Sequence, residues 1–300
     1  MIFQYYKYGT FETAIKKKTI RLSDITKSND SAELTYIAQF IDPIFRKVYS
    51  SDTTKKLKKY DSNFFEYALD HELKDWFTEE HRYYTQYVSC FSGAPDMLSQ
   101  WRGYGDDGKG VSIGFDEAEL LSLNPEGSPV LDLKKVQYWQ RSQKARVREA
   151  AENFLKQLKK IIDEADKLDS TVVDKDKYIK DKSVNCYHTT FYKLFQLGTY
   201  FKSPFFKEEK EIRLSLLQTK NGDDFNILLA HGAKFGEHGV NPGGRGQKFV
   251  DINFSSCDFN PFKLVTLGPK CEKTISDVEN FLTNNGVTGC KIVASEGTYR

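Results

Sequence analysis

Two carboxylates and a guanidinium alternate along one short stretch of the chain, at Glu209, Glu211 and Arg213. Ile212 and Leu214 fall between and after them, which is the two-residue period of a half-buried β-strand. Side chains two residues apart on a strand point to the same face, so we expect the three polar groups to project together beside an apolar core. They would either pair with one another or meet a polar ligand where the strand begins. The alternative is a solvated charged face that leads into an edge strand.

The composition of the 300-residue chain is that of a folded protein with a well-hydrated surface. Its 44 Lys and Arg against 42 Asp and Glu give a net charge of +2, which does not indicate a nucleic-acid-binding protein. Its 22 Phe and 17 Tyr are more rings than a core usually needs. We therefore expect some of them to line surfaces or pockets.

The five cysteines are scattered, without a Cys-x-x-Cys pair. Neither a disulfide framework nor a structural zinc site is expected, which favours a reducing cytoplasm. The first residues lack the charged lead and apolar run of a signal peptide. No apolar stretch approaches the length that spans a bilayer, so we expect no membrane contact.

Short strands scattered among long helical stretches predict an α+β fold. We expect one α+β domain over residues 1–300, built on a small mixed or split β-sheet, with helical insertions at 31–86 and 141–200. Besides the strand after Glu211, the expected strands are 2–8, 19–22, 87–92, 111–115, 248–252, 263–267 and 290–294. The expected shorter helices are 11–18, 97–104 and 276–284, with a charged connection at 169–182 and a Gly-rich loop at 232–246.

The longest expected helix carries an apolar seam at four-three spacing between residues 147 and 168. Such a seam suits a facing helix, and packing within its own domain explains it most simply. A contact with a partner or with a second copy of the chain, through the 147–168 helix, is the alternative.

Two familiar letter patterns fail on their context. Gly103-x-Gly105-x-x-Gly108 has the spacing of a dinucleotide fingerprint, but a strand follows where a helix must begin. Gly110–Gly114 has the letters of a hydrolase nucleophile elbow, but Ser112 lies inside the expected strand 111–115 rather than at a strand-to-helix turn.

Metal chemistry has little support in the sequence. Pro95-Asp96 with Glu208-x-Lys210 resembles the letters of a metal-dependent nuclease, yet more than a hundred residues separate the two parts. The five histidines lack metal-ligand spacing, so no metal site is expected. They are His71, His81, His188, His231 and His238.

Several segments together resemble an uncharacterised bacterial domain family found among accessory and phage-defence genes. The shared pattern combines a Tyr-Lys-Tyr start, Cys-Phe-Ser, a Trp-x-x-Tyr loop, Glu-x-Glu-x-Arg, Gly-Pro-Lys and a closing Tyr-Arg. This chain supplies Tyr6–Tyr8, Cys90–Ser92, Trp101 with Tyr104, Lys109-Gly110, Lys202 with Phe206, Glu209 to Arg213, Gly268–Lys270 and Tyr299-Arg300. It departs from the pattern at Gly9, where the family often has Arg.

The order of these segments is also similar to that of ADP-ribosyltransferases. Those enzymes have a basic or His residue on the first strand, a Ser on a second strand, and a Glu-x-Glu or lone Glu entering a later strand. This resemblance implies that NAD is the substrate. It further implies that Glu211 stabilises the oxocarbenium-like transition state, while Glu209 orients or deprotonates the acceptor. The implied binding set is Lys7, Tyr8, Ser89, Ser92, Trp101, Arg102, Tyr104 and Arg213.

Other readings of the same residues stay open. A sensor module could bind a nucleotide or a phage protein in the polar cleft without chemistry, and a metal-dependent nuclease is a third reading. Trp101 could be a core residue, Ser92 could cap a turn, and Arg213 could neutralise Glu211 or Glu209. The acceptor, whether protein, nucleic acid or small molecule, is not identified by the sequence.

Overall fold

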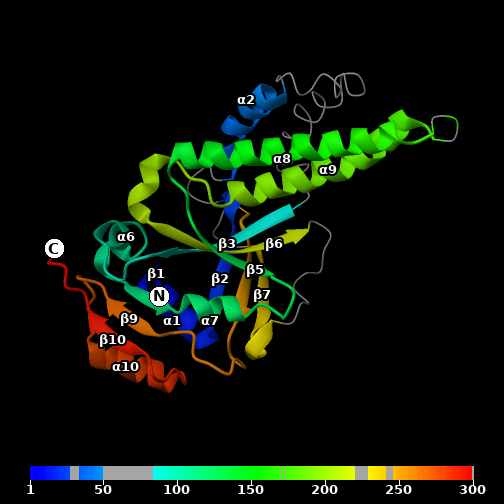
Figure 1. Ribbon diagram of the computed structural model, residues 1–300. Coiled ribbons are helices and arrows are strands. Elements are labelled where there is room, and N and C mark those ends of the chain that lie inside the picture. The colour runs from blue at the N-terminus through cyan, green and yellow to red at the C-terminus, as the bar shows by residue number, and fades with distance from the viewer. Residues whose placement is uncertain are drawn as a thin grey trace. The chain divides into compact units, whose positions relative to one another are not determined.

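Figure 1 shows a computed structural model of the chain. It describes residues 1–27, 34–49, 84–169, 171, 173–219, 229–240 and 246–298. The chain separates into two compact units. Unit 1 comprises Met1–Ser31, Tyr84–Val136 and Phe205–Arg300, and unit 2 comprises Ala32–Tyr83 and Gln137–Pro204. The two expected helical insertions largely coincide with the two segments of unit 2.

Unit 1 is a mixed β-sheet with short helices. Its strands are β1 Ile2–Tyr6, β2 Thr19–Asp24, β3 Tyr84–Ser92, β4 Val111–Phe115, β5 Leu131–Lys135, β6 Glu211–Thr219, β7 Lys234–Val240, β8 Lys248–Asn253, β9 Leu264–Leu267 and β10 Lys291–Ala294. Its α-helices are α1 Tyr8–Lys17, α6 Leu98–Gly103, α7 Glu117–Ser122 and α10 Ile275–Asn284. Short 3₁₀ turns include η5 Asp106–Gly108 and η8 Ala230–Gly232.

The sheet forks at β3. One edge of β3 pairs along its whole length with β6, from Tyr84 opposite Thr219 to Ser92 opposite Glu211. The other edge therefore receives both β1, paired at Ser92, and β2, paired at Val88 and Tyr87. Beyond β1 lie β4, β9 and β10, and beyond β2 lie β8 and β7. Two half-sheets thus diverge from one strand.

Alternation along the strands gives the sheet two chemically different faces. On what we call the core face, Ile20, Phe91, Leu214 and Ile252 belong to one buried cluster. That cluster also holds Phe11 of α1, Leu120 of α7 and Leu282 of α10. Burying a side chain of this size stabilises the fold by about 1.5–3 kcal/mol. The opposite face of β2, β3, β6 and β8, the polar face, carries the polar residues in between.

Unit 2 is helical, with η2 Thr35–Ile37, α2 Ala38–Tyr49, α8 Gln140–Asp166 and α9 Lys175–Gly198. The expected apolar seam is buried inside it: Phe154 of α8 lies edge-on to Tyr187 of α9, with ring centroids 4.7 Å apart. Phe45 of α2 contributes a ring 6.1 Å from Phe154. The seam therefore packs within its own unit.

The α+β class is confirmed, and most expected strands lie within two residues of their predicted bounds. The sheet is larger than expected, with ten strands among the described residues. β3 begins at Tyr84, three residues before its predicted start, and residues 50–83 of the expected insertion lie outside the described part of the chain.

Three segments required correction. The expected loop 232–246 contains β7, which is obscured because it carries Gly236 and Gly239 and a register shift between Phe235 and His238. The expected charged connection 169–182 contains the start of α9, whose N-cap Asp174 accepts hydrogen bonds from the backbone N–H groups of Asp176 and Lys177. The prediction identified neither α7 nor β5, both short elements.

Glycine at position 110 is required by close backbone packing. A Cβ atom there would lie 1.9 Å from the carbonyl oxygen of Tyr6, at the end of β1. A Cβ atom added at Gly9, the second residue of α1, would have no neighbouring atom within 4 Å. The two glycines therefore differ in what they tolerate.

We expect Gly110→Ala to lower the free energy of unfolding by at least about 3 kcal/mol, because backbone must move to admit the methyl group. Gly9→Ala should raise it by about 0.5 kcal/mol through helix propensity. Urea unfolding followed by circular dichroism measures both. Equal stability of the two variants would contradict the close approach of Gly110 to β1.

Candidate functional site

The first residue of β6 is Glu211, and the turn before it changes one prediction. Residues Pro204–Glu209 form the 3₁₀ turn η6, and Lys210 adopts a left-handed conformation with φ of 46°. Glu209 therefore precedes the strand instead of sharing its polar face, so the predicted register was wrong there. Glu211, Arg213 and Ser215 do share that face, since Ile212 and Leu214 lie in the core.

Glu211 and Arg213 form a buried, bidentate ion pair. The guanidinium Nε donates to Oε1 at 2.7 Å and Nη2 donates to Oε2 at 3.1 Å. Arg213 is fully buried and Glu211 is 6% exposed. A planar guanidinium held in this way fixes the carboxylate in one orientation.

Ser92 lies directly beside this pair. Its Cα is the antiparallel partner of Glu211 on one side and of Phe3 on the other. The first strand, the Ser-bearing strand and the Glu-bearing strand are therefore immediate neighbours. The Ser92 hydroxyl also accepts a hydrogen bond from the Ala94 N–H at 3.3 Å, so it caps the following turn.

Cys90 occupies the opening of the fork. It lies between Val88, where β2 pairs, and Ser92, where β1 pairs, and it is the register partner of Arg213. Its side chain is exposed, whereas its strand neighbours are buried. The polar face is thus reachable at the point where the two half-sheets separate.

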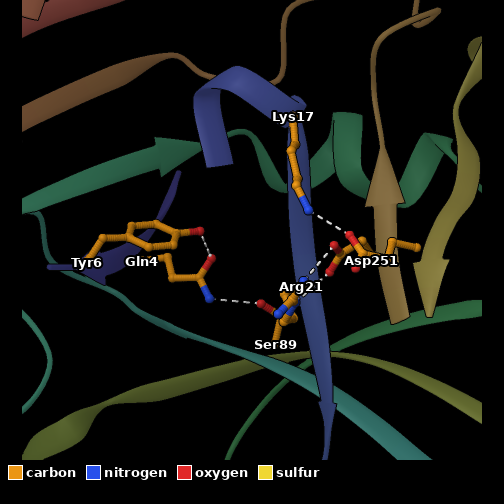
Figure 2. Close-up of polar contacts among 7 residues, drawn as sticks. Gln4, Tyr6, Lys17, Arg21, Ser89 and Asp251 are labelled. Carbon is orange, nitrogen blue, oxygen red and sulfur yellow. Dashed lines mark hydrogen bonds and ion pairs between the residues drawn. The ribbon is translucent and has the colours of Figure 1, made fainter. Parts of the chain in front are cut away.

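Ser89 points away from Glu211. It is an odd number of residues from Ser92 on β3, so it lies on the core face. There its hydroxyl accepts a hydrogen bond from Gln4 Nε2 at 2.9 Å, and Tyr6 donates its hydroxyl to Gln4 (Figure 2). Ser89 therefore braces β1 against β3 instead of joining the Glu211 set.

A second ion pair crosses from β2 to β8 on the polar face. Arg21 donates from Nε and Nη2 to the two carboxylate oxygens of Asp251, at 2.7 and 2.9 Å. The guanidinium also lies 3.7 Å from the ring centroid of Phe249. Asp251 is 1% exposed, whereas the Arg21 side chain is 40% exposed. This pair presents a fixed guanidinium beside the fork.

The Tyr6–Gln4–Ser89 chain and the Arg21–Asp251 pair lie near each other at the fork. Burial, and then the charge of Asp251, raise the pKa of Tyr6 well above its ordinary value. Figure 2 shows the Tyr6–Gln4–Ser89 chain next to the Arg21–Asp251 pair. Sequence reasoning missed Gln4, Arg21 and Asp251. The available signal was a polar residue between apolar ones within each expected strand, at Arg21 and Asp251.

Lys7 and Tyr8 are not brought to Glu211. They follow β1, four and five residues beyond Phe3, the partner of Ser92. At about 3.3 Å per strand residue this separates Lys7 from the level of Ser92 by about 13 Å. Lys7 is exposed at the N-cap of α1, and the Tyr8 ring packs near Phe11.

The Trp101 indole is a packing residue. It is 1% exposed, stands edge-on to Tyr5 at 4.6 Å, and donates its Nε1–H to Asp96 at 2.6 Å. Arg102 and Tyr104, at the end of α6 and just after it, are exposed. Asp96 also accepts from Ser295 Oγ at 2.8 Å and from the Glu296 N–H at 2.9 Å. It therefore joins the loop before α6 to the segment after β10.

Other expectations concern metals and membranes. The five cysteines are free. Among the described residues, no three His, Cys, Asp or Glu side chains lie together as a metal-binding group. The described helices include none that is both long and apolar enough to cross a membrane. Outside the described part of the chain lie His71 and His81, together with the closing Tyr299-Arg300 of the family pattern.

Removal of Asp251 should destabilise the fold more than removal of Glu237, the carboxylate partner of exposed Lys17. Asp251→Ala removes the buried carboxylate that binds the Arg21 guanidinium, and this should lower the free energy of unfolding by about 2–3 kcal/mol. Glu237→Ala should leave stability unchanged within error, because its ion pair is solvated. Chemical denaturation measures both, and equal losses would contradict the assigned importance of the β2–β8 pair.

Asp96 should make stability depend on acid pH. Burial opposes its ionisation, but the hydrogen bonds from Trp101, Ser295 and Glu296 lower its pKa below the ordinary value. Its stabilising contribution is therefore present above the unfolded pKa of about 4 and is lost as the pH falls through the folded pKa. The stability difference between wild type and Asp96→Asn should be largest above about pH 5 and shrink on acidification. A difference independent of pH would refute this.

Comparisons with known proteins give a family match over part of the chain. Residues 100–214 match the model of a family described as "Protein of unknown function (DUF2971)". The matched segment begins just before Trp101 and ends just after Arg213, so it contains Glu211 but not Ser92. No curated protein and no solved structure matches the chain. Over residues 100–214 the chain is thus similar to an uncharacterised family.

Proposed function

We propose that this chain is an NAD-consuming ADP-ribosyltransferase-like enzyme that acts in the bacterial cytoplasm as a toxin or a phage-defence effector. One observation carries the proposal: Ser92 lies between the first strand and Glu211, and Glu211 is the residue at which β6 begins. The strand β1, the Ser-bearing strand β3 and the Glu-bearing strand β6 are therefore adjacent, whereas Lys7 and Tyr8 lie beyond the end of β1. The site is open beside them, at Cys90.

The proposed chemistry assigns a role to each of the neighbouring groups. The bond between nicotinamide and ribose breaks, its electron pair leaves with nicotinamide, and positive charge develops on the ribose. The acceptor's nucleophilic atom then bonds to the same ribose carbon and loses its proton. The fixed Glu211 carboxylate faces the developing charge and accepts hydrogen bonds from ribose hydroxyls.

Arg213 keeps the Glu211 carboxylate in one orientation in this scheme. Ser92 supports the same edge from β3. Glu209, two residues before Glu211 at the end of η6, would orient or deprotonate the acceptor.

A binding module without chemistry is the second candidate, favoured by the engagement of both Glu211 oxygens with Arg213. Such a module would hold a nucleotide or a phage protein at the same fork. The nuclease reading relies on Asp96, whose carboxylate is engaged by Trp101, Ser295 and Glu296. DNA or RNA cleavage that EDTA abolishes would support the nuclease instead.

The test is nicotinamide release and label transfer from labelled NAD in the presence of cell lysate, part of it protease-treated and part nuclease-treated. Glu211→Gln, which keeps the shape of the side chain, should reduce both signals by about 100-fold or more. Glu208→Gln, an exposed neighbour in η6, is the matched control and should retain wild-type rates.

Each outcome separates the candidates. Label that survives only one treatment identifies the acceptor as protein or nucleic acid. If wild type and Glu211→Gln release nicotinamide at the same rate, Glu211 has no role in the mechanism. NAD binding by calorimetry without turnover by wild type would favour the binding module, and neither binding nor turnover would end the NAD proposal.

A further inference from the structure

Unit 2 contains an open groove of about 400 Å³ between α2 and α8, which we call the α2–α8 groove. Aliphatic side chains form part of its lining, namely Ile44 and Val48 of α2 and Leu155 of α8. Its other described lining residues are four cations and one carboxylate, which give a net charge of +3: Lys47, Arg148, Lys156, Lys159 and Glu152. The groove therefore combines an apolar surface with an excess of positive charge.

Three of these cations have no carboxylate to neutralise them. Within the part of the chain that the structure describes, Arg148, Lys156 and Lys159 form no ion pair. By contrast, the next residue, Lys160, lies 3.9 Å from Glu164. Lys159 is also half-buried, so part of its side chain is withdrawn from water beside the apolar lining. The groove thus holds uncompensated positive charge next to an apolar surface.

We propose that the α2–α8 groove binds a small anionic amphiphile, a single aliphatic chain that ends in a carboxylate or a phosphate group. The aliphatic chain lies on Ile44, Val48 and Leu155, where it is removed from water. The anionic group meets the unpaired cations of α8 in charge-assisted hydrogen bonds. Small-molecule sites have volumes of about 300–1,000 Å³ and combine an apolar lining with a few polar groups, which agrees with this groove.

Larger anionic partners fit this groove less well. The residues that α2 contributes to the lining, from Ile44 to Val48, extend about 6 Å along the helix axis, which is about one turn. An acidic helix is about 10 Å across, and docking one would require an apolar strip of several turns. Nucleic acid also fits less well, because the described lining lacks the aromatic rings on which bases stack.

Calorimetric titration of the full-length chain tests the proposal. Decanoate and decyl phosphate are the two probes, and at least one should bind with a Kd of about 0.1 mM or lower at about 50 mM salt. The lower of the two Kd values tells a fatty acid from a phosphorylated lipid as the source of the ligand. Octanoate should bind about tenfold more weakly than decanoate, because it buries two fewer CH₂ groups. Decylammonium, with the same chain and the opposite charge, should bind at least about tenfold more weakly than the better probe.

Charge reversal inside the groove is compared with the same change just outside its described lining. Lys159→Glu should raise the Kd of the better probe at least about tenfold, since it places a carboxylate against the anionic group. Lys160→Glu changes the net charge equally and should bind like wild type. Ile44→Ser should weaken both probes about tenfold by removing part of the apolar surface. Circular dichroism on every variant separates a lost site from lost folding.

Several results would overturn the proposal. One is the absence of binding of both probes at about 5 mM. Another is equal binding of decylammonium and the better probe, which would remove the role of the cations. Binding that Lys159→Glu and Ile44→Ser both leave unchanged would place the ligand elsewhere on the chain. Inorganic phosphate that binds as tightly as decyl phosphate would show that the aliphatic chain contributes nothing.

Discussion

The uninterrupted pairing of β3 with β6 is the constraint on which the rest of unit 1 depends. Because β6 occupies one whole edge of β3, both β1 and β2 must attach to the other edge, at its two ends. Backbone groups in the middle of that edge, next to Cys90, have neither strand as a ladder partner among the described residues. The fork is therefore a consequence of strand pairing.

Two bidentate arginine–carboxylate pairs stand on the polar face, one on each side of β3. Glu211 and Arg213 are both buried, so their cost of desolvation is high and is offset only by good geometry. In the Arg21–Asp251 pair only the carboxylate is buried, and the guanidinium remains partly in water. The first arrangement fixes a carboxylate at the start of a strand. The second fixes a cation near the opening. Both are the kind of preorganised charge that ligand sites require.

Unit 2 follows a different physical plan. Its stability comes from rings and aliphatic side chains packed between α2, α8 and α9, whereas its surface separates positive from negative charge along α8. The same helix thus contributes an apolar seam to its own unit and a charged face to solvent.

The sequence by itself determined the α+β class, most strand positions, the long helix and the shared face of Glu211, Arg213 and Ser215, because two- and four-three-residue periods are local properties. It did not locate β7, whose glycines and bulge break the alternation, nor the start of α9 within a highly charged segment. Only the tertiary structure decided that Ser92 faces the Glu211 edge while Ser89 does not, that Trp101 is used in packing, and that Arg21 meets Asp251 across 230 positions. The reason is that alternation assigns faces within one strand, whereas strand order and register, set by many weak long-range contacts, decide which residues of different strands become neighbours.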